Sequence, residues 1–418
     1  MKTRLLVRGP ALSQSGYGEQ TRFALRALRS REDLFDVYLQ NIPWGNTGWI
    51  CKDDDERAWI DSLVAKAELN KQSQQGFDVS LQITIPNEWK KVAPVNIGYT
   101  AGIETTMVAP VWIQLGDQMD HIIVVSNHSK NVYQNTKINF ANENGTIIQE
   151  NVSVSTPITV VNFPTRISEP LIEGLDLMTD FNFLTVAQWG PRKNLEKSIK
   201  CFVEEFMNEN VGLVVKTNIG KNNKIDRDNT RARLKQMLEK FPDRKCKIYL
   251  LHGVLSEEEL SGLYQHSKIK AYISITHGEG FGLPLFESAY YGLPVVAPVW
   301  SGQCDFLNMP TINKSGKKKI KTMCAKIDHE LKPVGQEAVW DGVIDKHSSW
   351  AYPSLNSYKN KLRDVYKDHS RFKSQAKKLQ TWVLDNFEPE QKYEEFVSCI
   401  TTTLDSNNES REQEVMVL

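Results

Sequence analysis

The sequence has no net charge and few cysteines. In its 418 residues, 51 Lys and Arg are matched by 51 Asp and Glu. Non-specific binding of nucleic acid requires an excess of cations clustered on one face of a protein, so we do not expect nucleic acid as a partner. The six cysteines lie far apart and include no Cys-x-x-Cys pair. This spacing argues against a cysteine metal site and predicts reduced thiols in a cytoplasmic protein.

Long apolar runs are also absent. No run approaches the roughly 18 apolar residues of a membrane-spanning helix. The first eight residues, MKTRLLVR, hold only three consecutive apolar residues, which is too few for the apolar core of a secretory signal. We therefore expect a soluble cytoplasmic protein without a targeting segment. Peripheral contact with a membrane stays open, without support from the sequence.

Short β-branched runs alternate with segments of helical periodicity, a pattern typical of βα units in parallel sheets. The first set of predicted strands covers residues 5–7, 79–83, 95–99, 121–125 and 158–161, and the second covers 183–187, 213–216, 247–251, 271–275 and 294–297. The polar stretch between the sets predicts a linker. We predict an α/β protein with two doubly wound, Rossmann-like domains (1–165 and 181–386), a linker (166–180), a C-terminal helix (387–404) that packs back toward the first domain, and a flexible tail (405–418).

The segment after the predicted strand 271–275 reads HGEGFGLPLFESAY, residues 277–290. Three glycines in five positions let the backbone approach a ligand closely, and the loop ends at a helix N-terminus, where N–H groups and the helix dipole favour a phosphate. Glu279 lies in the loop and Glu287 about one turn inside the helix, so both carboxylates can accept hydrogen bonds from a bound polyol phosphate. The alternative is a solvated Glu279 and a Glu287 stabilised by the dipole alone.

This segment resembles glycosyltransferase family 4, whose signature is two glutamates separated by seven residues within a Gly-Phe-Gly-Leu-Pro run. The resemblance continues through the Tyr-Gly-Leu-Pro-Val-Val-Ala sequence at 291–297. It implies the GT-B fold, with two facing Rossmann-like domains and the active site in the cleft between them. It also implies that Glu279 contacts the donor sugar, that Glu287 contacts the nucleotide ribose, and that the backbone of Gly280, Phe281, Gly282 and Leu283 binds the donor.

A second motif, TVAQWGPRKN at 185–194, follows the first predicted strand of the second domain. Adjacent cations here would neutralise a diphosphate and stabilise the charge that grows as the nucleotide leaves. The family has a basic pair at this place: Lys193 aligns with its lysine, while Ala187-Gln188 replaces the usual Gly-Arg and leaves Arg192 to supply the second charge. We therefore predict Glu279, Lys193 and Arg192 as the catalytic residues. The alternative is a solvated basic pair at the start of a helix.

Three further segments resemble the family less specifically. Gly16, Tyr17 and Gly18 lie in a glycine-containing loop after the first strand, where the glycines are predicted to approach the donor and Tyr17 the acceptor; a plain tight turn is the alternative. Glu104 and Thr105 follow another strand and are candidates for acceptor binding, with helix capping or packing as the alternative. His252, Gly253 and Val254 resemble the segment whose backbone meets the nucleotide base.

Two motifs are set aside. Asp53-Asp54-Asp55 contains the Asp-x-Asp of metal-dependent GT-A enzymes, but it precedes a predicted helix, where N-capping explains it; we expect no metal ion. The basic run SGKKKIK at 315–321 lies in a predicted loop. A solvated face explains the run, with an anionic lipid, nucleic acid or charged glycan as alternative ligands.

Together these motifs predict a retaining glycosyltransferase that moves a hexose from a nucleotide diphosphate sugar to a hydroxyl of a glycan, a glycolipid or another acceptor. The nucleotide sugar is a co-substrate, and no cofactor is expected. Two alternatives stay open: a catalytically silent GT-B protein that binds a nucleotide sugar or glycan, and a sugar phosphorylase on the same fold.

Overall fold

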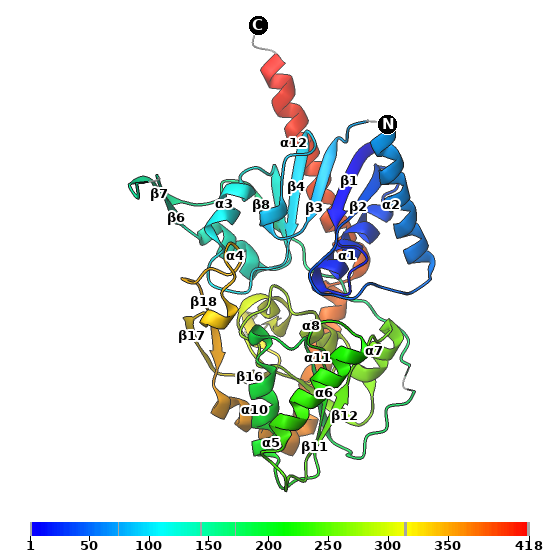
Figure 1. The fold of residues 1–418 in the computed structure, drawn as a ribbon, viewed down its shortest axis with the longest axis vertical. Coiled ribbons are helices and arrows are strands. Elements are labelled where there is room, and N and C mark those ends of the chain that lie inside the picture. The colour runs from blue at the N-terminus through cyan, green and yellow to red at the C-terminus, as the bar shows by residue number, and fades with distance from the viewer. Residues whose placement is uncertain (1, 74, 143, 172, 313–315, 416–418) are drawn as a thin grey trace. The chain divides into compact units, whose positions relative to one another are not determined.

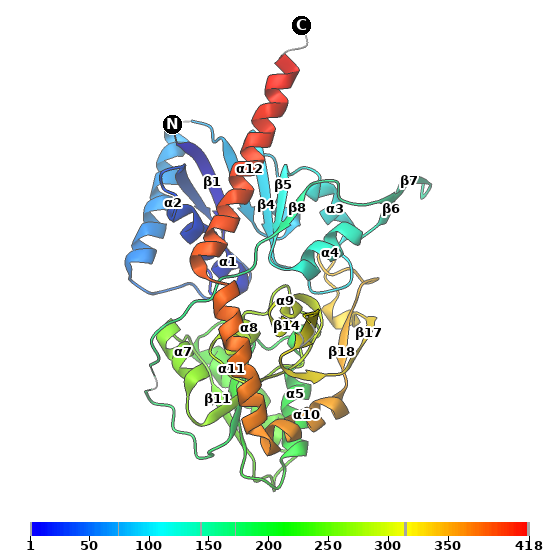
Figure 2. The same cartoon turned by 180° about the vertical axis from the view of Figure 1, so that it is seen from behind.

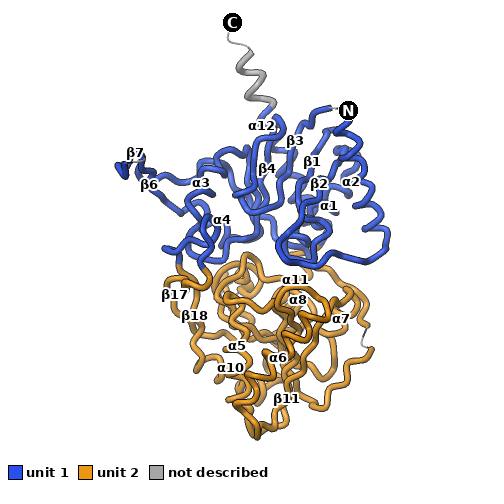
Figure 3. The backbone as a smooth tube through the Cα atoms, in the orientation of Figure 1, with its two compact units in different colours: residues 1–164, 339–348, 389–418 blue, residues 165–338, 349–388 orange. Residues whose placement is uncertain are grey.

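The computed structural model describes residues 2–73, 75–142, 144–171, 173–312 and 316–415. The chain forms two compact units, each assembled from separate parts of the sequence (Figure 3). Unit 1 comprises residues 1–164, 339–348 and 389–418, and unit 2 comprises residues 165–338 and 349–388. Each unit is built on one six-stranded sheet, and the paired strands of both sheets are parallel.

The sheet of unit 1 has the strand order β2-β1-β3-β4-β5-β8. Its strands are β1 (Thr3–Gly9), β2 (Phe35–Asn41), β3 (Val79–Ile83), β4 (Val95–Thr100), β5 (His121–Val124) and β8 (Ile158–Val160), and its helices are α1 (Gly16–Arg29), α2 (Asp55–Ser73), α3 (Pro110–Gly116) and α4 (Asn127–Asn135) (Figure 1). Every residue of β3 and β4 is buried, as expected for central strands of a parallel sheet with both faces covered. All five strands predicted in this half are confirmed, and β2 is an additional strand.

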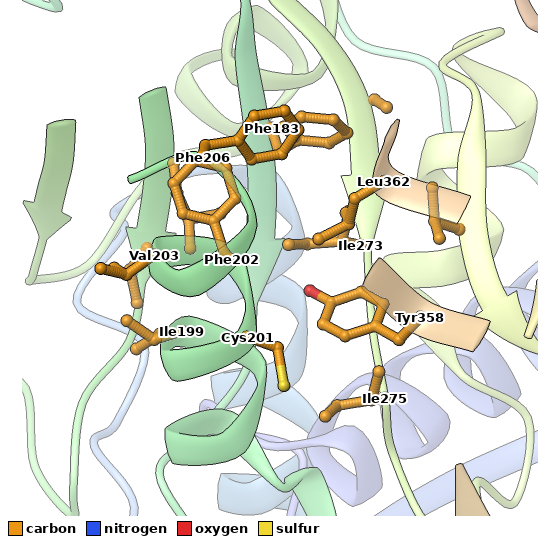
Figure 4. Close-up of a cluster of buried hydrophobic side chains, with 14 of the residues drawn as sticks. Phe183, Ile199, Cys201, Phe202, Val203, Phe206, Ile273, Ile275, Tyr358 and Leu362 are labelled. Carbon is orange, nitrogen blue, oxygen red and sulfur yellow. The ribbon is translucent and has the colours of Figure 1, made fainter. Parts of the chain in front are cut away.

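The sheet of unit 2 has the order β11-β10-β9-β12-β13-β16. Its strands are β9 (Asn182–Val186), β10 (Gly212–Lys216), β11 (Lys247–Leu251), β12 (Ile269–Ile273), β13 (Val295–Pro298) and β16 (Ala325–Ile327), and its helices are α5 (Leu195–Glu205), α6 (Lys224–Leu238), α7 (Glu257–Gln265), α8 (Leu283–Tyr290), α9 (Cys304–Leu307), α10 (Leu355–Lys367) and α11 (His369–Asn386). The five predicted strands are again confirmed. Phe183 of β9 packs with Phe202 and Phe206 from α5 and its C-terminal end in the core of this unit (Figure 4).

The last helix, α12 (Pro389–Val415), contacts α1 and β4 of unit 1 (Figure 2). Phe396 of α12 is fully buried, and its ring centre lies 5.4 Å from that of Phe23 in α1 and 5.2 Å from that of Tyr99 in β4. The helix continues past residue 404, where we predicted its end. No helix within the described ranges has the length and apolar character to cross a membrane.

Within the described residues the chain also forms three two-stranded antiparallel sheets: β6 (Ile138–Ala141) with β7 (Ile147–Val152), β14 (Asn308–Ile312) with β15 (Lys318–Thr322), and β17 (His329–Pro333) with β18 (Ser349–Pro353). The basic run was predicted to be a loop, and this prediction is wrong for Lys318–Lys321, because these residues pair with β14. Ser315, the first residue of the run, lies outside the described residues.

The segment between β17 and β18 includes residues 339–348, which belong to unit 1. The carbonyl oxygen of Gly342 accepts hydrogen bonds from Nδ2 of Asn87 at 2.9 Å and from Nε1 of Trp112 at 3.0 Å. Gly342 has a φ of +71°, a conformation that glycine adopts without strain. We had predicted these residues as part of the second domain (181–386), and unit 1 holds them instead.

Candidate active site

The strand order of unit 2 identifies where a ligand can bind. The chain continues from β9 to β10 and β11 on one side of the sheet, whereas β12 and β13 lie on the other side of β9. Loops that leave β9 and β12 therefore diverge beyond the carboxyl ends of these strands, the usual binding position in a doubly wound sheet. These loops contain the two predicted motifs at 185–194 and 277–290.

The loop after β12 is held in an unusual backbone conformation. Gly282 precedes α8 with a φ of +97°, which favours glycine. Ser301 Oγ accepts a hydrogen bond from the Glu279 amide at 2.9 Å, and the Gly302 amide donates to the Glu279 carbonyl at 2.9 Å. A Cβ atom on Gly302 would lie 2.0 Å from the carbonyl oxygen of Gly280. Ser301 and Gly302, which follow β13, thus hold the backbone of Glu279 in place, and the close approach of the two segments requires a glycine at position 302.

The loop after β9 brings two cations to the same place. A short 3-10 helix (Pro191–Lys193) precedes α5, and the carbonyl oxygen of Arg192 accepts a hydrogen bond from the His277 amide at 2.9 Å. Arg192 Nη1 lies 2.9 Å from Glu279 Oε2, and Lys193 Nζ lies 2.6 Å from Oε1 and 2.8 Å from Oε2. The structure therefore brings the three predicted catalytic residues into direct contact.

Glu279 is ionised within this cluster. Its side chain is only 9% exposed, and burial alone would raise the pKa of its carboxyl group. The adjacent Lys193 and Arg192 cations outweigh this effect and lower the pKa of Glu279 to about 2, from an ordinary 4.5. A carboxylate with so low a pKa accepts hydrogen bonds well but is a poor proton acceptor at neutral pH.

Glu287 lies in α8 and contacts a second element of the unit. Its Oε2 accepts a hydrogen bond from the Tyr264 hydroxyl of α7 at 2.7 Å. Burial raises the pKa of Tyr264 well above its ordinary value, and the nearby Glu287 charge adds to this. The Tyr264 hydroxyl therefore stays protonated and serves as a donor that orients the Glu287 carboxylate.

The predicted base-binding segment follows β11 at the same edge of the sheet. Gly253 has a φ of +119°, and Val254 is 57% exposed. The side chain of His252 is 4% exposed, and its Nε2 lies 3.9 Å from Asp226 Oδ2 and has no hydrogen-bond partner among the described residues. Burial lowers the pKa of His252, against the opposing charge of Asp226, so its imidazole is neutral at pH 7.

Lys216, which we did not predict from the sequence, is a further candidate residue at this edge of the sheet. It ends β10, and its Nζ donates to the carbonyl oxygen of Gly253 at 2.6 Å. Burial lowers the pKa of Lys216. A lysine at the carboxyl end of a buried apolar strand was the available signal, since a cation there must lie among the ligand-binding loops.

The unit 1 candidates form a separate group. Ser15 Oγ caps α1 by accepting from the Gly18 amide at 3.1 Å, and a Cβ atom on Gly18 would lie 1.9 Å from the Ser13 carbonyl oxygen. Nothing lies within 4 Å of the corresponding position on Gly16. Gly16, Tyr17 and Gly18 thus lie in the first turn of α1 and not in the loop that we predicted, and close packing requires a glycine at position 18.

Tyr17 links this turn to the segment after β4. Its hydroxyl lies 2.7 Å from Thr100 Oγ1 and accepts from the Gly102 amide at 3.1 Å; burial raises the pKa of Tyr17, so the hydroxyl stays protonated. Glu104 and Thr105 follow directly and line a small pocket. Thr105 is buried and donates through Oγ1 to the Met107 carbonyl at 2.8 Å, which limits its availability to a ligand.

The aspartate triplet is explained by helix capping. Asp54 Oδ1 accepts a hydrogen bond from the Arg57 amide at 2.8 Å at the start of α2. Among the residues with described positions, no three His, Cys, Asp or Glu side chains form a group that could hold a metal ion.

One segment of the chain matches a family of known proteins. Residues 173–311 match the family described as glycosyl transferases group 1, and this segment includes Arg192, Lys193, Glu279 and Glu287. No curated protein matches the sequence significantly.

Solved structures establish the fold. The chain is similar to a sucrose-phosphate synthase from Thermosynechococcus elongatus, with 12% identity over 97% of this chain and 100% of that one and a TM-score of 0.62. It is also similar to HepE of Anabaena, solved with UDP and glucose, with 12% identity over 96% of this chain and 100% of that one and a TM-score of 0.59. A glycosyltransferase from Rickettsia africae is similar as well, with 13% identity over 96% of this chain and 99% of that one and a TM-score of 0.55. Two α/β units with parallel sheets and this likeness give the chain the GT-B class of fold.

Proposed function

We propose that this chain is a retaining, metal-independent glycosyltransferase of family 4 that transfers a hexose from a nucleotide diphosphate sugar to an acceptor hydroxyl. The proposal rests mainly on one observation: Arg192 and Lys193 both contact Glu279 beyond the carboxyl ends of β9 and β12. The match of residues 173–311 to a glycosyltransferase family and the UDP and glucose bound to the similar HepE protein support the choice of reaction and donor class.

The donor diphosphate is proposed to bind beside Arg192 and Lys193 and before the N-terminus of α8. Two cations and the partial positive charge of a helix end can together stabilise the charge that develops on a leaving phosphate. Both cations are partly exposed, at 26% and 20% of their side chains, so a ligand can reach them. This arrangement is proposed to take the place of the divalent cation that metal-dependent transferases use.

The two glutamates are proposed to bind hydroxyl groups of the donor. The carboxylate of Glu279 has four lone-pair positions, and ion pairing to two cations keeps it ionised and able to accept from sugar hydroxyls. Glu287, oriented by Tyr264, is proposed to accept from the ribose. The base is proposed to meet the backbone at Gly253, close to Lys216.

Transfer is proposed to occur by attack of the acceptor hydroxyl on the face from which the nucleotide leaves. The bond between the sugar C1 and the phosphate oxygen breaks, a bond between C1 and the acceptor oxygen forms, and the departing phosphate takes the acceptor proton. The low pKa of Glu279 makes this carboxylate a poor general base, which favours the phosphate as proton acceptor. Glycans, glycolipids and other hydroxyl compounds are the proposed acceptor classes.

Binding of the donor can be tested by thermal shift with UDP, GDP and ADP sugars. A ligand that binds only the folded chain raises its unfolding temperature, and at equal ligand concentration the tighter ligand gives the larger shift. We expect one donor base to give the largest shift. Absence of a shift with every donor at millimolar concentration would contradict the proposal.

Catalysis can be tested with Lys193→Ala, Glu279→Ala and the control Lys200→Ala, whose side chain on α5 is 60% exposed. We expect the first two to lower the transfer rate by at least about 100-fold and the control to match the wild type. Near wild-type rates in both site variants would refute the site. NMR of the product reports its anomer, and inversion relative to the donor would refute retention.

The same assays separate the two alternatives. A silent binding protein gives a thermal shift without transfer or hydrolysis across the donor panel. A phosphorylase releases a sugar phosphate in a reaction that requires inorganic phosphate and no nucleotide.

A further inference from the structure

The hairpin β14–β15 of unit 2 combines exposed apolar side chains with a concentration of lysines. Ile312 and Ile320 are 72% and 67% exposed, although isoleucine is among the residues most often buried. Residues 308–322 contain five lysines and no acidic residue, in a chain whose total charge is zero. The hairpin is therefore strongly basic in a chain that is neutral overall, and it also exposes two large apolar side chains.

The register of the hairpin places the two isoleucines on one face. Ile312 pairs with Lys318, and Ile320 pairs with Pro310; residues directly opposite one another, and residues two apart on a strand, share a face. Lys319 and Lys321 project from the other face. All three lysines of β15 are exposed.

We propose that the hairpin β14–β15 docks the chain on an anionic lipid surface. Interfacial segments insert apolar side chains at the boundary of the acyl chains while basic side chains contact anionic headgroups. Long lysine side chains reach the headgroup level from either face of the hairpin. Exposed isoleucines that are costly in water are stabilised by this insertion.

The composition of the hairpin favours lipid over nucleic acid. Single strands of nucleic acid are bound by aromatic side chains that stack on bases, and residues 308–322 include no Phe, Tyr or Trp. Branched aliphatic side chains instead match acyl chains. This proposal is independent of the transfer reaction, because none of the hairpin residues belongs to the proposed active site.

The test is co-sedimentation of the full chain with vesicles of phosphatidylcholine alone and of phosphatidylcholine mixed with phosphatidylserine. We expect binding only to the mixed vesicles, and weakening by added salt because the charges are solvent-exposed. Each lysine near an anionic surface contributes about a fivefold gain in affinity. The triple variant Lys318→Glu/Lys319→Glu/Lys321→Glu should therefore bind at least roughly 100-fold more weakly.

Two matched controls separate the hairpin from general effects. The variant Lys373→Glu/Lys377→Glu/Lys378→Glu makes the same charge change at exposed positions of α11, and we expect it to retain most of the binding. The variant Ile312→Ser/Ile320→Ser should weaken binding on the order of tenfold or more. Its control is Ile147→Ser/Ile148→Ser on the lysine-free hairpin β6–β7, where the isoleucines are 49% and 63% exposed, and this should bind as the wild type does.

Several results would overturn the proposal: no binding to either vesicle, equal binding to both, or equal losses in the hairpin and α11 variants. Preferential binding of an RNA or DNA oligomer that abolishes vesicle binding would assign the hairpin to nucleic acid instead. Thermal unfolding and the donor-induced shift, measured on every variant, distinguish loss of folding or of donor binding from loss of the lipid contact.

Discussion

The substitution Glu279→Gln tests whether the central ion cluster of unit 2 is as strong as its geometry indicates. The side chain is 9% exposed and contacts two cations within 3 Å. The difference between its pKa of about 2 and the ordinary 4.5 corresponds to roughly 3 kcal/mol of stabilisation at neutral pH. Removing one partner of a buried ion pair typically costs about 3–5 kcal/mol, and the partial exposure of Arg192 and Lys193 favours the lower end. We therefore expect a loss of about 3 kcal/mol in the free energy of unfolding.

The pH dependence of this loss identifies its cause. Because the folded-state pKa of Glu279 is lowered, the stabilisation is fully present above pH 4.5 and disappears as the pH falls from 4.5 toward 2. The stabilities of the wild type and of Glu279→Gln should therefore converge over this range, although other carboxylates destabilise both proteins in acid.

The measurement is urea unfolding of both proteins at several values of pH between 7 and 3, with Glu196→Gln as the control. Glu196 forms an exposed ion pair with Arg233, and such pairs contribute about 1 kcal/mol or less. A difference below about 1 kcal/mol for Glu279→Gln at pH 7, or one that does not change with pH, would refute the argument.

Three further predictions concern the packing and polar contacts of unit 2. Gly302→Ala should lower both stability and transfer rate, because its Cβ atom would overlap a backbone oxygen at 2.0 Å, whereas Gly190→Ala has no neighbour within 4 Å; thermal unfolding and initial rates compare the two, and equal behaviour would contradict the packing argument. Tyr264→Phe removes the hydrogen bond to Glu287 and should weaken donor binding by roughly fivefold, about 1 kcal/mol, as measured by titration calorimetry; unchanged affinity would show that Glu287 needs no orientation. Lys216→Met keeps the apolar stem but removes the ammonium group that contacts Gly253, and it should weaken donor binding without changing the product anomer; unchanged affinity would remove Lys216 from the donor site.

The sequence predicted the strands that form short apolar or β-branched runs between helical segments. These include β3 and β4, in which every residue is buried. It did not predict β2, where Asp36 and Gln40 interrupt the apolar pattern, or β16, where the exposed Lys326 is the middle of only three residues. The lysine strand β15 was missed for a different reason: it is held by pairing with β14 and buries little of its surface, so it lacks the alternation on which strand prediction depends.

The contacts of the candidate site that could be predicted are those between loops that follow neighbouring strands. β9 and β12 are neighbouring parallel strands, so the loops that follow them start side by side at the same edge of the sheet, and the proximity of Lys193 and Glu279 follows from this topology. The partner of Glu287 did not follow, because Tyr264 comes from another helix whose rotation is set by packing. Residues 339–348 were assigned to the second domain because their neighbours in sequence belong to it. Their contacts with Asn87 and Trp112 join positions far apart in sequence, and no sequence pattern indicates such contacts.

The division of unit 1 into separate parts of the sequence sets the order in which it can be completed during synthesis. A ribosome adds about 5–20 residues per second, so α12 emerges roughly 10 to 50 seconds after residue 164. During that interval Phe23 and Tyr99 lack the fully buried Phe396 that packs against both. The surface of Phe23 and Tyr99 that Phe396 covers in the folded unit therefore stays uncovered until α12 is made.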